Sequence, residues 1–209
     1  AEFAQKGIAR GRSIVAAIYD RGVVLVAENP SASLYKISEI YDRIAFAGVG
    51  KYNEFDRLRE AGIRWADGTG FTYSREDVDA RALANYYGQH LGDMFTEGQK
   101  PLEVEILVAQ LGNKWHPTKL YRIAYEGTIT DEPRFVVLGG DAQTIKDRFA
   151  ELDDSIHPLE FTLKSAVTAL AGPDRTVPPT DLEVGILEDR GSRRTFTRLD
   201  DARVSELLS

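Results

Sequence analysis

Cysteine is absent from this chain of 209 residues, and histidine and methionine are scarce, with three and one respectively. Without cysteine the chain can form no disulfide, no thiolate metal site and no cysteine nucleophile. Its hydrophobic content of 43% is nevertheless sufficient for an ordinary core, because a chain of this length can bury roughly 70% of the surface that it exposes when unfolded. The sequence therefore predicts a single domain spanning residues 1–209.

Positive charge is also in deficit. The chain has 26 Lys and Arg against 33 Asp and Glu, so its formal net charge is −7. Such a chain is poorly suited to holding a phosphate backbone, which argues against nucleic acid as a partner. The sequence has no run of 18 apolar residues and no basic N-terminal region followed by an apolar one. We therefore expect no membrane partner and a cytoplasmic location.

The chain begins at Ala1 without an initiator methionine, in a segment that already has a helical pattern through Arg10. In a helix, Phe3, Ala4 and Ile8 would lie on one face. We therefore expect that a segment ahead of Ala1 is missing.

Several strands are followed by two amphipathic helices in the first half of the chain. Strands are predicted over residues 13–18, 23–27, 34–38 and 43–48. Most are apolar at consecutive positions, which is typical of a sheet covered on both faces. Helices are predicted over residues 51–67, from an apolar repeat every three to four positions, and from a capping-box-like start at Ser74 through Phe95.

The second half of the chain repeats this order. Strands are predicted over residues 104–109, 120–125 and 135–138, followed by helices over 141–152 and 158–170. A last hairpin over 182–187 and 195–199 precedes a short helix over 202–208. Two such halves without a linker predict an α/β fold in which two sheets pack together and a helix pair covers each outer face. The predicted fold class is therefore a four-layer αββα sandwich.

Generic motifs for catalysis and binding are absent or incomplete. The sequence GVGK at residues 48–51 is only part of a phosphate-binding loop, because Ala45 and Tyr52 stand where that motif needs Gly and Ser or Thr. The histidines stand in different predicted elements and lack the spacing of metal ligands: His90, His116 and His157. No metal site and no cofactor is predicted, and these motifs alone do not indicate an enzyme.

A more specific signal lies in three stretches: GIARGRS at residues 7–13, YDRGVVLVAENP at 19–30 and KISEIYDRIAFAGVGKYNEF at 36–55. Together they resemble the α subunits of actinobacterial proteasome cores. The resemblance continues through FVVLGG at residues 135–140 and covers the chain from Glu2 to about Leu187.

The resemblance implies the fold of N-terminal-nucleophile hydrolases, a four-layer sandwich like the one predicted from the element order. In proteolytic β subunits of that fold, an acid and a lysine support an N-terminal threonine nucleophile. The matching positions here are Arg12 for the nucleophile, Glu28 for the acid and Lys36 for the lysine. Arginine cannot act as this nucleophile, and a predicted helix precedes it. The resemblance therefore implies a non-catalytic subunit of a threonine endopeptidase complex whose active sites are on the β subunits.

The resemblance also implies partners. In this family, α subunits form the seven-membered outer rings on the β rings and gate the axial channel with their N-terminal residues, which would here precede Ala1. The C-terminal tails of a hexameric AAA ATPase activator insert between adjacent α subunits, and substrates arrive as unfolded, modifier-tagged proteins. Lys36 matches the lysine that meets the tail carboxylate, and Gly50 matches a glycine of the same pocket. A turn would explain Gly50 equally well.

Two alternatives stay open at this point. A self-processing N-terminal-nucleophile hydrolase would use a residue such as Ser13, the hydroxyl next to position 12. An unrelated α/β binding module would be monomeric and would form no ring.

Overall fold

The computed structural model describes residues 1–10, 12–31, 33–98, 100–150 and 155–209. In this part of the chain, two five-stranded antiparallel sheets form, with the strand orders β10-β9-β2-β1-β8 and β3-β4-β5-β6-β7. The strands of the first sheet are β1 (Ile14–Tyr19), β2 (Gly22–Glu28), β8 (Phe135–Leu138), β9 (Leu182–Glu188) and β10 (Phe196–Leu199). Those of the second are β3 (Ile37–Tyr41), β4 (Ile44–Gly50), β5 (Val104–Gln110), β6 (Lys119–Ile123) and β7 (Ile129–Glu132).

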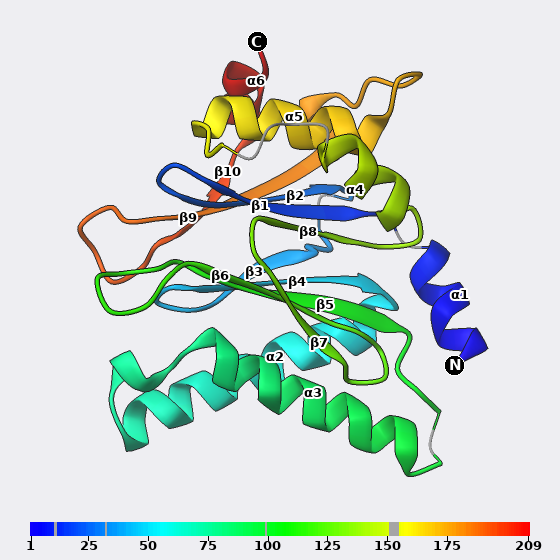
Figure 1. The fold of residues 1–209 in the computed structure, drawn as a ribbon, viewed down its shortest axis with the longest axis vertical. Helices are drawn as coiled ribbons and strands as arrows, with labels where there is room; N and C mark the ends of the chain where they lie inside the picture. The colour runs from blue at the N-terminus through cyan, green and yellow to red at the C-terminus, as the bar shows by residue number, and fades with distance from the viewer. Residues whose placement is uncertain (11, 32, 99, 151–154) are drawn as a thin grey trace.

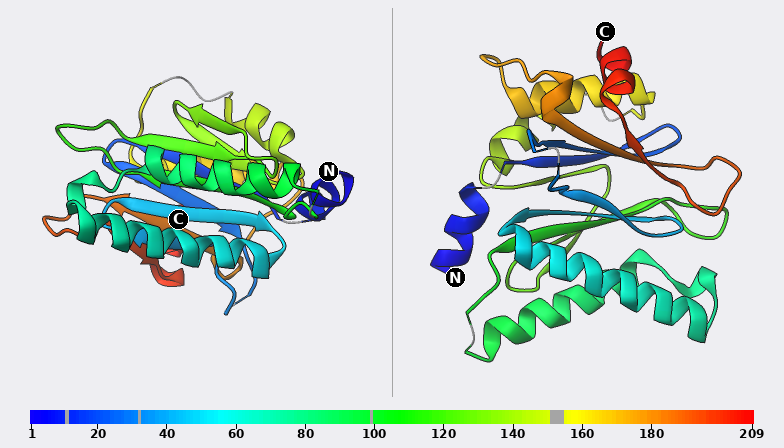
Figure 2. Two further views of the ribbon diagram at one scale, coloured as in Figure 1. Left: turned by 90° about the horizontal axis from the view of Figure 1, so that it is seen from below. Right: turned by 180° about the vertical axis from the view of Figure 1, so that it is seen from behind.

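Helices cover the outer face of each sheet, as Figure 1 shows. The first sheet is covered by α4 (Ala142–Ala150), α5 (Leu159–Ala171) and α6 (Asp201–Leu208), and the second by α2 (Tyr52–Thr72) and α3 (Ala80–Thr96). Helix α1 (Glu2–Arg10) lies outside these layers, at one end of the sandwich (Figures 1 and 2). The four-layer αββα sandwich predicted from the element order is therefore confirmed.

The strands that are apolar at consecutive positions serve two cores at once. In β1, Ile14 and Ala16 face the second sheet, whereas Val15 and Ala17 face the helices of the first. All four side chains are at most 1% exposed. A strand buried on both faces gains from apolar residues at every position, which is why alternation is missing from its sequence.

Two strands of the second sheet, β3 and β7, depart from the sequence prediction. The strand expected over residues 34–38 begins only at Ile37 and runs to Tyr41, and Leu34 is 48% exposed. Strand β7 was not predicted, because three of its four residues are polar. Both strands are edges of their sheet, where side chains do not have to be apolar on both faces.

Helix boundaries differ as well. Helix α2 continues to Thr72, beyond its predicted end at residue 67. Its last buried residue is Ala66, and the apolar residue of the added turn, Phe71, is 94% exposed, so the amphipathic pattern ends before the helix does. Helix α3 does not start at Ser74. The N-cap is Asp79, whose Oδ1 accepts a hydrogen bond of 2.7 Å from the amide of Ala82. The predicted helix end at residue 152 lies outside the described residues.

None of the described helices is long and apolar enough to cross a membrane.

Helices α2 and α3 approach closely at Gly62. The hydroxyl of Tyr87 on α3 donates a hydrogen bond of 2.7 Å to the carbonyl of Leu58, one turn before Gly62 on α2. A Cβ atom at position 62 would lie 1.9 Å from that hydroxyl oxygen. Gly68, on the same helix, has no other atom within 4 Å of such a Cβ. On α2, packing therefore requires glycine at position 62 but not at position 68.

We predict opposite effects of alanine at these two positions. Gly62→Ala is expected to lower the free energy of unfolding by about 1 to 3 kcal/mol, because the added methyl group displaces the Tyr87 hydroxyl. Gly68→Ala is expected to raise it by up to about 1 kcal/mol, the usual gain from alanine within a helix. Urea unfolding followed by circular dichroism measures both, and a shift of the same sign in the two variants would contradict this packing.

Candidate functional site

The predicted site residues lie near the end of the sandwich where α1 leads into β1 (Figure 1). Arg12 stands between α1 and β1, and Glu28 is the last residue of β2, the neighbouring strand. Lys36 immediately precedes β3, and Gly50 is the last residue of β4. The antiparallel order brings these four positions, scattered in the sequence, to the same end of the two sheets.

Glu28 lies between two arginines. Its Oε1 accepts a hydrogen bond from Arg12, and Arg175 donates through both terminal nitrogens, at 3.1 Å to Oε1 and 2.9 Å to Oε2. The side chain of Glu28 is only 12% exposed, whereas both arginines are about half exposed. The bond from Arg175 is the main cause that lowers the pKa of Glu28, and Arg12 acts in the same direction against the effect of burial. Glu28 is therefore an ionised, paired carboxylate.

The geometry around position 12 contains no activated nucleophile. Arg12 offers no hydroxyl or thiol, and its guanidinium is engaged by Glu28. Ser13 is 8% exposed and lies against Gly139, and in the described part of the chain no basic side chain forms a hydrogen bond with its hydroxyl. A serine nucleophile needs such a base to take its proton. The arrangement gives no support to Ser13 as a nucleophile.

Lys36 is held by its backbone, while its side chain is half-buried. Its amide donates to Oε1 of Glu183 at 2.9 Å, and its carbonyl accepts from the amide of Gly48 at 3.1 Å. Burial is the main cause that lowers its pKa. The charge of Arg12 adds to this effect, and Glu183 and Glu28 oppose it. Among the described residues, no carboxylate oxygen lies within 4.0 Å of its Nζ. The ammonium group is thus near two carboxylates but bonded to neither.

The backbone at position 50 requires glycine for a structural reason that is independent of any binding role. Its φ is +109°, and a Cβ atom there would lie 2.0 Å from the carbonyl oxygen of Glu103. Because Lys36 stands opposite Gly48, Gly50 is two residues further along the neighbouring strand, at the same end of the sheet. The side chain of Glu103 also contacts Gly7 of α1 closely. Glu103 therefore lies between Gly50, at the end of β4, and Gly7 of α1.

Three residues near this site did not emerge from the sequence: Arg175, Glu183 and Arg198. Glu183 is 6% exposed, and its Oε2 accepts a hydrogen bond of 2.6 Å from Nη1 of Arg198 on the adjacent strand β10. Its sequence signal is an acid flanked by apolar residues within strand β9, whose other acid, Glu188, is the last residue of the strand. Arg175 lies in a loop, where nothing in the sequence distinguishes it from other surface arginines.

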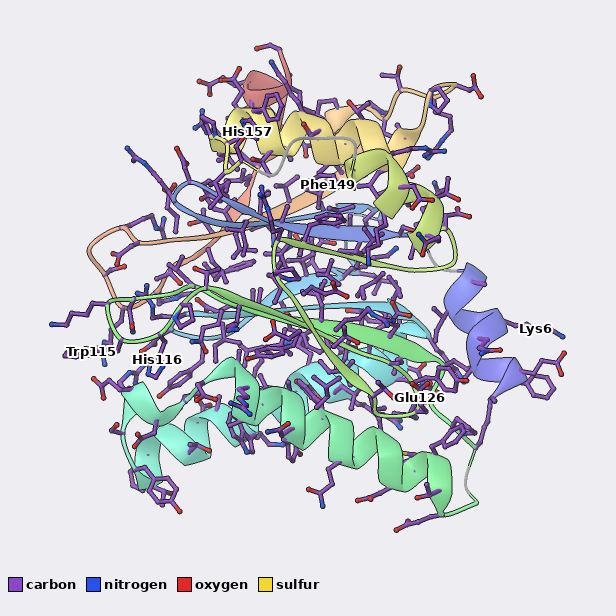
Figure 3. The ribbon with its side chains drawn as sticks, viewed as in Figure 1. Lys6, Trp115, His116, Glu126, Phe149 and His157 are labelled. Atoms are coloured by element: carbon purple, nitrogen blue, oxygen red, sulfur yellow. The ribbon has the colours of Figure 1, made fainter. Side chains whose placement is uncertain are left out.

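The histidines do not come together. Figure 3 shows His157 beside α5 and His116 in the connection between β5 and β6, on different halves of the molecule. The ring of His157 packs against Phe161, with centroids 4.1 Å apart. Among the described residues, no group of three or more His, Asp or Glu is arranged to hold a metal ion.

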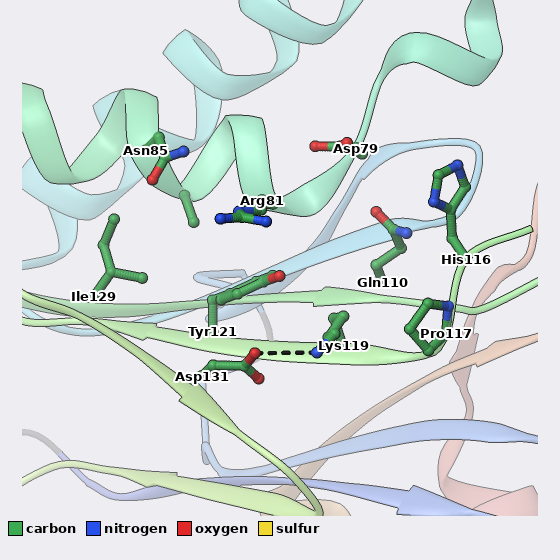
Figure 4. A pocket seen from close by; sticks show the side chains of 11 residues that line it. Asp79, Arg81, Asn85, Gln110, His116, Pro117, Lys119, Tyr121, Ile129 and Asp131 are labelled. Atoms are coloured by element: carbon green, nitrogen blue, oxygen red, sulfur yellow. Dashed lines mark hydrogen bonds and ion pairs between the residues drawn. The ribbon is translucent and has the colours of Figure 1, made fainter.

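A separate polar pocket of about 610 Å³ lies between α3 and strands β5 to β7 (Figure 4). Arg81 and Asn85 line it from α3, and Tyr121 lines it from β6. An ion pair of 3.1 Å between Lys119 Nζ and Asp131 Oδ2 crosses its strand side. None of the predicted site residues contributes to this pocket.

Comparison with known proteins identifies one family. The model of the proteasome subunit family matches residues 8–172. A relative from Acidimicrobium ferrooxidans is 58% identical over 208 residues, which cover 100% of this chain and 90% of that protein. Relatives from Sanguibacter keddieii and an Arthrobacter species are 50% and 48% identical, each across 100% of this chain and across 84% and 92% of their own lengths. All three are named proteasome subunit alpha.

The arrangement around Glu28 predicts a pH-dependent contribution to stability. Because its pKa is lowered from the ordinary value of 4.5, the stabilisation is present above that value and is lost as the pH falls through the folded pKa. Glu28→Gln is expected to lower the free energy of unfolding by about 1 kcal/mol at neutral pH, since the two arginines then face each other without their shared carboxylate.

Urea unfolding of both proteins, from neutral pH down to about pH 3, measures this dependence. The difference between variant and wild type is expected to shrink toward acid pH. Glu160→Gln is the control, since Glu160 forms an exposed pair with Lys164 at 3.3 Å, and it should change stability by less than about 0.5 kcal/mol. A Glu28→Gln effect that does not depend on pH would contradict the role of the charge.

Proposed function

The chain belongs to the proteasome subunit family, and we propose that it acts as a non-catalytic α subunit of the proteasome core, in the outer ring, where it controls entry to the proteolytic chamber. Its similarity to three proteins named proteasome subunit alpha, over the whole of its length, supports this assignment. Arg12 is the observation that supports a non-catalytic role. It lies between α1 and β1 and is paired with Glu28. The chain then works as one domain over residues 1–209.

The partners of the proposed subunit are its own copies and the β subunits. Copies of the chain form a seven-membered ring, and this ring covers the β ring, whose threonine endopeptidase sites cleave the substrate. Helix α1 lies across the end of the sandwich, outside its layers (Figure 2), and the N-terminal residues of the subunit form the gate. Unfolded, modifier-tagged proteins pass through the channel, in the cytoplasm.

Lys36 and Gly50 form the proposed docking pocket for the C-terminal tails of a hexameric AAA ATPase activator. The Lys36 ammonium is half-buried and has no carboxylate within 4.0 Å in the described chain. A terminal carboxylate can therefore bind it directly, through a charge-assisted hydrogen bond worth roughly 1.5 to 3 kcal/mol. Gly50 lies at the same end of the sheet, two residues beyond the position on β4 that stands opposite Lys36.

The first prediction from this proposal concerns assembly and catalysis. The purified chain alone is expected not to hydrolyse fluorogenic peptides, whereas the chain combined with β subunits should form stacked seven-membered rings that do. Negative-stain images along the particle axis and peptide hydrolysis measure the two parts. Turnover that scales with the chain alone, together with a new N-terminus at Ser13 in mass spectrometry, would instead support a self-processing hydrolase.

The second prediction concerns Lys36. In particles assembled with β subunits, Lys36→Ala and Lys36→Glu are expected to abolish ATPase-stimulated degradation, because the tail carboxylate loses its cationic partner. The rate of stimulated degradation is measured relative to unstimulated cleavage of a small peptide by the same particles.

Lys119→Ala is the matched control for Lys36. Lys119 is also a partly exposed lysine of the second sheet, but it is paired with Asp131 beside the polar pocket of Figure 4. Its replacement should leave stimulation as it is in the wild type. Full stimulation of the Lys36→Ala particle would remove Lys36 from the docking role.

A further inference from the structure

Glu183 is a charged side chain in the apolar interior between the two sheets. Glu183 is 6% exposed, and each of its carboxylate oxygens accepts two hydrogen bonds. Oε1 accepts from Nδ2 of Asn29 and from the amide of Lys36, both at 2.9 Å. Oε2 accepts from the amide of Ile37 at 2.9 Å and from Nη1 of Arg198 at 2.6 Å. Four donors from three separate segments therefore converge on one carboxylate.

These bonds join one sheet to the other. Glu183 belongs to β9 in the first sheet, whereas Lys36 and Ile37 stand at the start of β3 in the second. Strand β3 is an edge strand, paired on one side with β4. The amides of Lys36 and Ile37 find their partner in the Glu183 carboxylate, which thus takes the place of a neighbouring strand.

Two side chains that donate to Glu183 also hold the same segment. Arg198 donates from Nη2 to the carbonyl of Ile37 at 2.5 Å, and its guanidinium lies 3.9 Å from the ring centre of Tyr35. Asn29 donates to the carbonyl of Leu34 at 2.8 Å as well as to Glu183. The backbone from residue 34 to 37 is therefore fixed by side chains before the regular strand begins.

The same arrangement determines which carboxylates are available to pair with the Lys36 ammonium. The charge of Glu183 is matched by Arg198, and that of Glu28 by Arg12 and Arg175. Both nearby carboxylates thus have their own cations, and neither lies within 4.0 Å of Lys36 Nζ in the described residues. A lysine beside an unpaired carboxylate would instead form an internal ion pair.

We propose that Glu183 is the positioning residue of the docking pocket: it fixes the Lys36 backbone and, through its pairing with Arg198, leaves the Lys36 ammonium to an incoming terminal carboxylate. This inference rests on the proposed function of Lys36. It accounts for the presence of a buried ion pair, Glu183 with Arg198, since such a pair is by itself weak evidence for a role in stability.

Glu183→Gln tests the inference in particles assembled with β subunits. The amide keeps the shape of the carboxylate, but its NH₂ group faces donors where an acceptor is needed. The activator concentration for half-maximal stimulation is expected to rise by about tenfold, while stimulation at saturation stays within about twofold of the wild type, because the ammonium is still present. An actinobacterial hexameric ATPase that stimulates the wild-type particle is the probe, and unstimulated peptide cleavage measures the amount of particle.

Glu105→Gln is the control for loss of a buried carboxylate. Glu105 lies on β5 with a side chain that is 14% exposed, next to Arg122 at 3.8 Å. A general loss of stability would lower the yield of particles in both variants without changing the half-maximal concentration. Only Glu183→Gln is expected to change it, whereas Glu105→Gln should stay within about twofold of the wild type.

Arg198→Lys gives an independent test that does not depend on recovery of the Glu183→Gln particle. Lysine keeps the charge but cannot reach Glu183 and the Ile37 carbonyl together. The activator concentration for half-maximal stimulation is therefore expected to rise by about threefold. An unchanged half-maximal concentration in either variant overturns the positioning role if Lys36→Ala abolishes stimulation. Full stimulation of Lys36→Ala would contradict the docking function itself, and the two failures are therefore distinguishable.

Discussion

Contact between the two sheets is the constraint on which the rest of the structure depends. The inner faces are apolar and closely packed, so every backbone group at their margin needs a partner inside the protein or in water. Within the described chain, the start of β3 meets this requirement through the Glu183 carboxylate. The same contact therefore joins the two sheets and positions the segment that carries Lys36.

Charge pairing holds the end of the sandwich at Arg12 together. The guanidinium of Arg12 shares Glu28 with Arg175. Glu28 thereby connects β2 with the loop after α5 and with the chain that follows α1. An ionised carboxylate between two arginines is suited to holding segments together, whereas proton transfer would require it to be released first.

Much of this could be predicted from the sequence, because apolar runs, turns and glycine positions are local signals. The layer order and most strands follow from them, and Arg12, Glu28 and Lys36 follow from the resemblance of their motifs. Glu183 and Arg175 could not be predicted in the same way, since Glu183 is 147 residues from Lys36 and Arg175 is 147 residues from Glu28 along the chain. An acid between apolar residues of a strand indicates burial, but only the fold shows which backbone amides it meets. The start of β3 was misplaced for the same reason.

Strand β7 affects the tendency of the chain to aggregate before it assembles with other subunits. It is an edge of the second sheet, and it presents Asp131 and Glu132 just before Pro133. Charges and proline at an exposed edge oppose the addition of further strands from other molecules. The polar composition that concealed this strand in the sequence is therefore a protection against aggregation, which matters most for a newly made subunit at high local concentration.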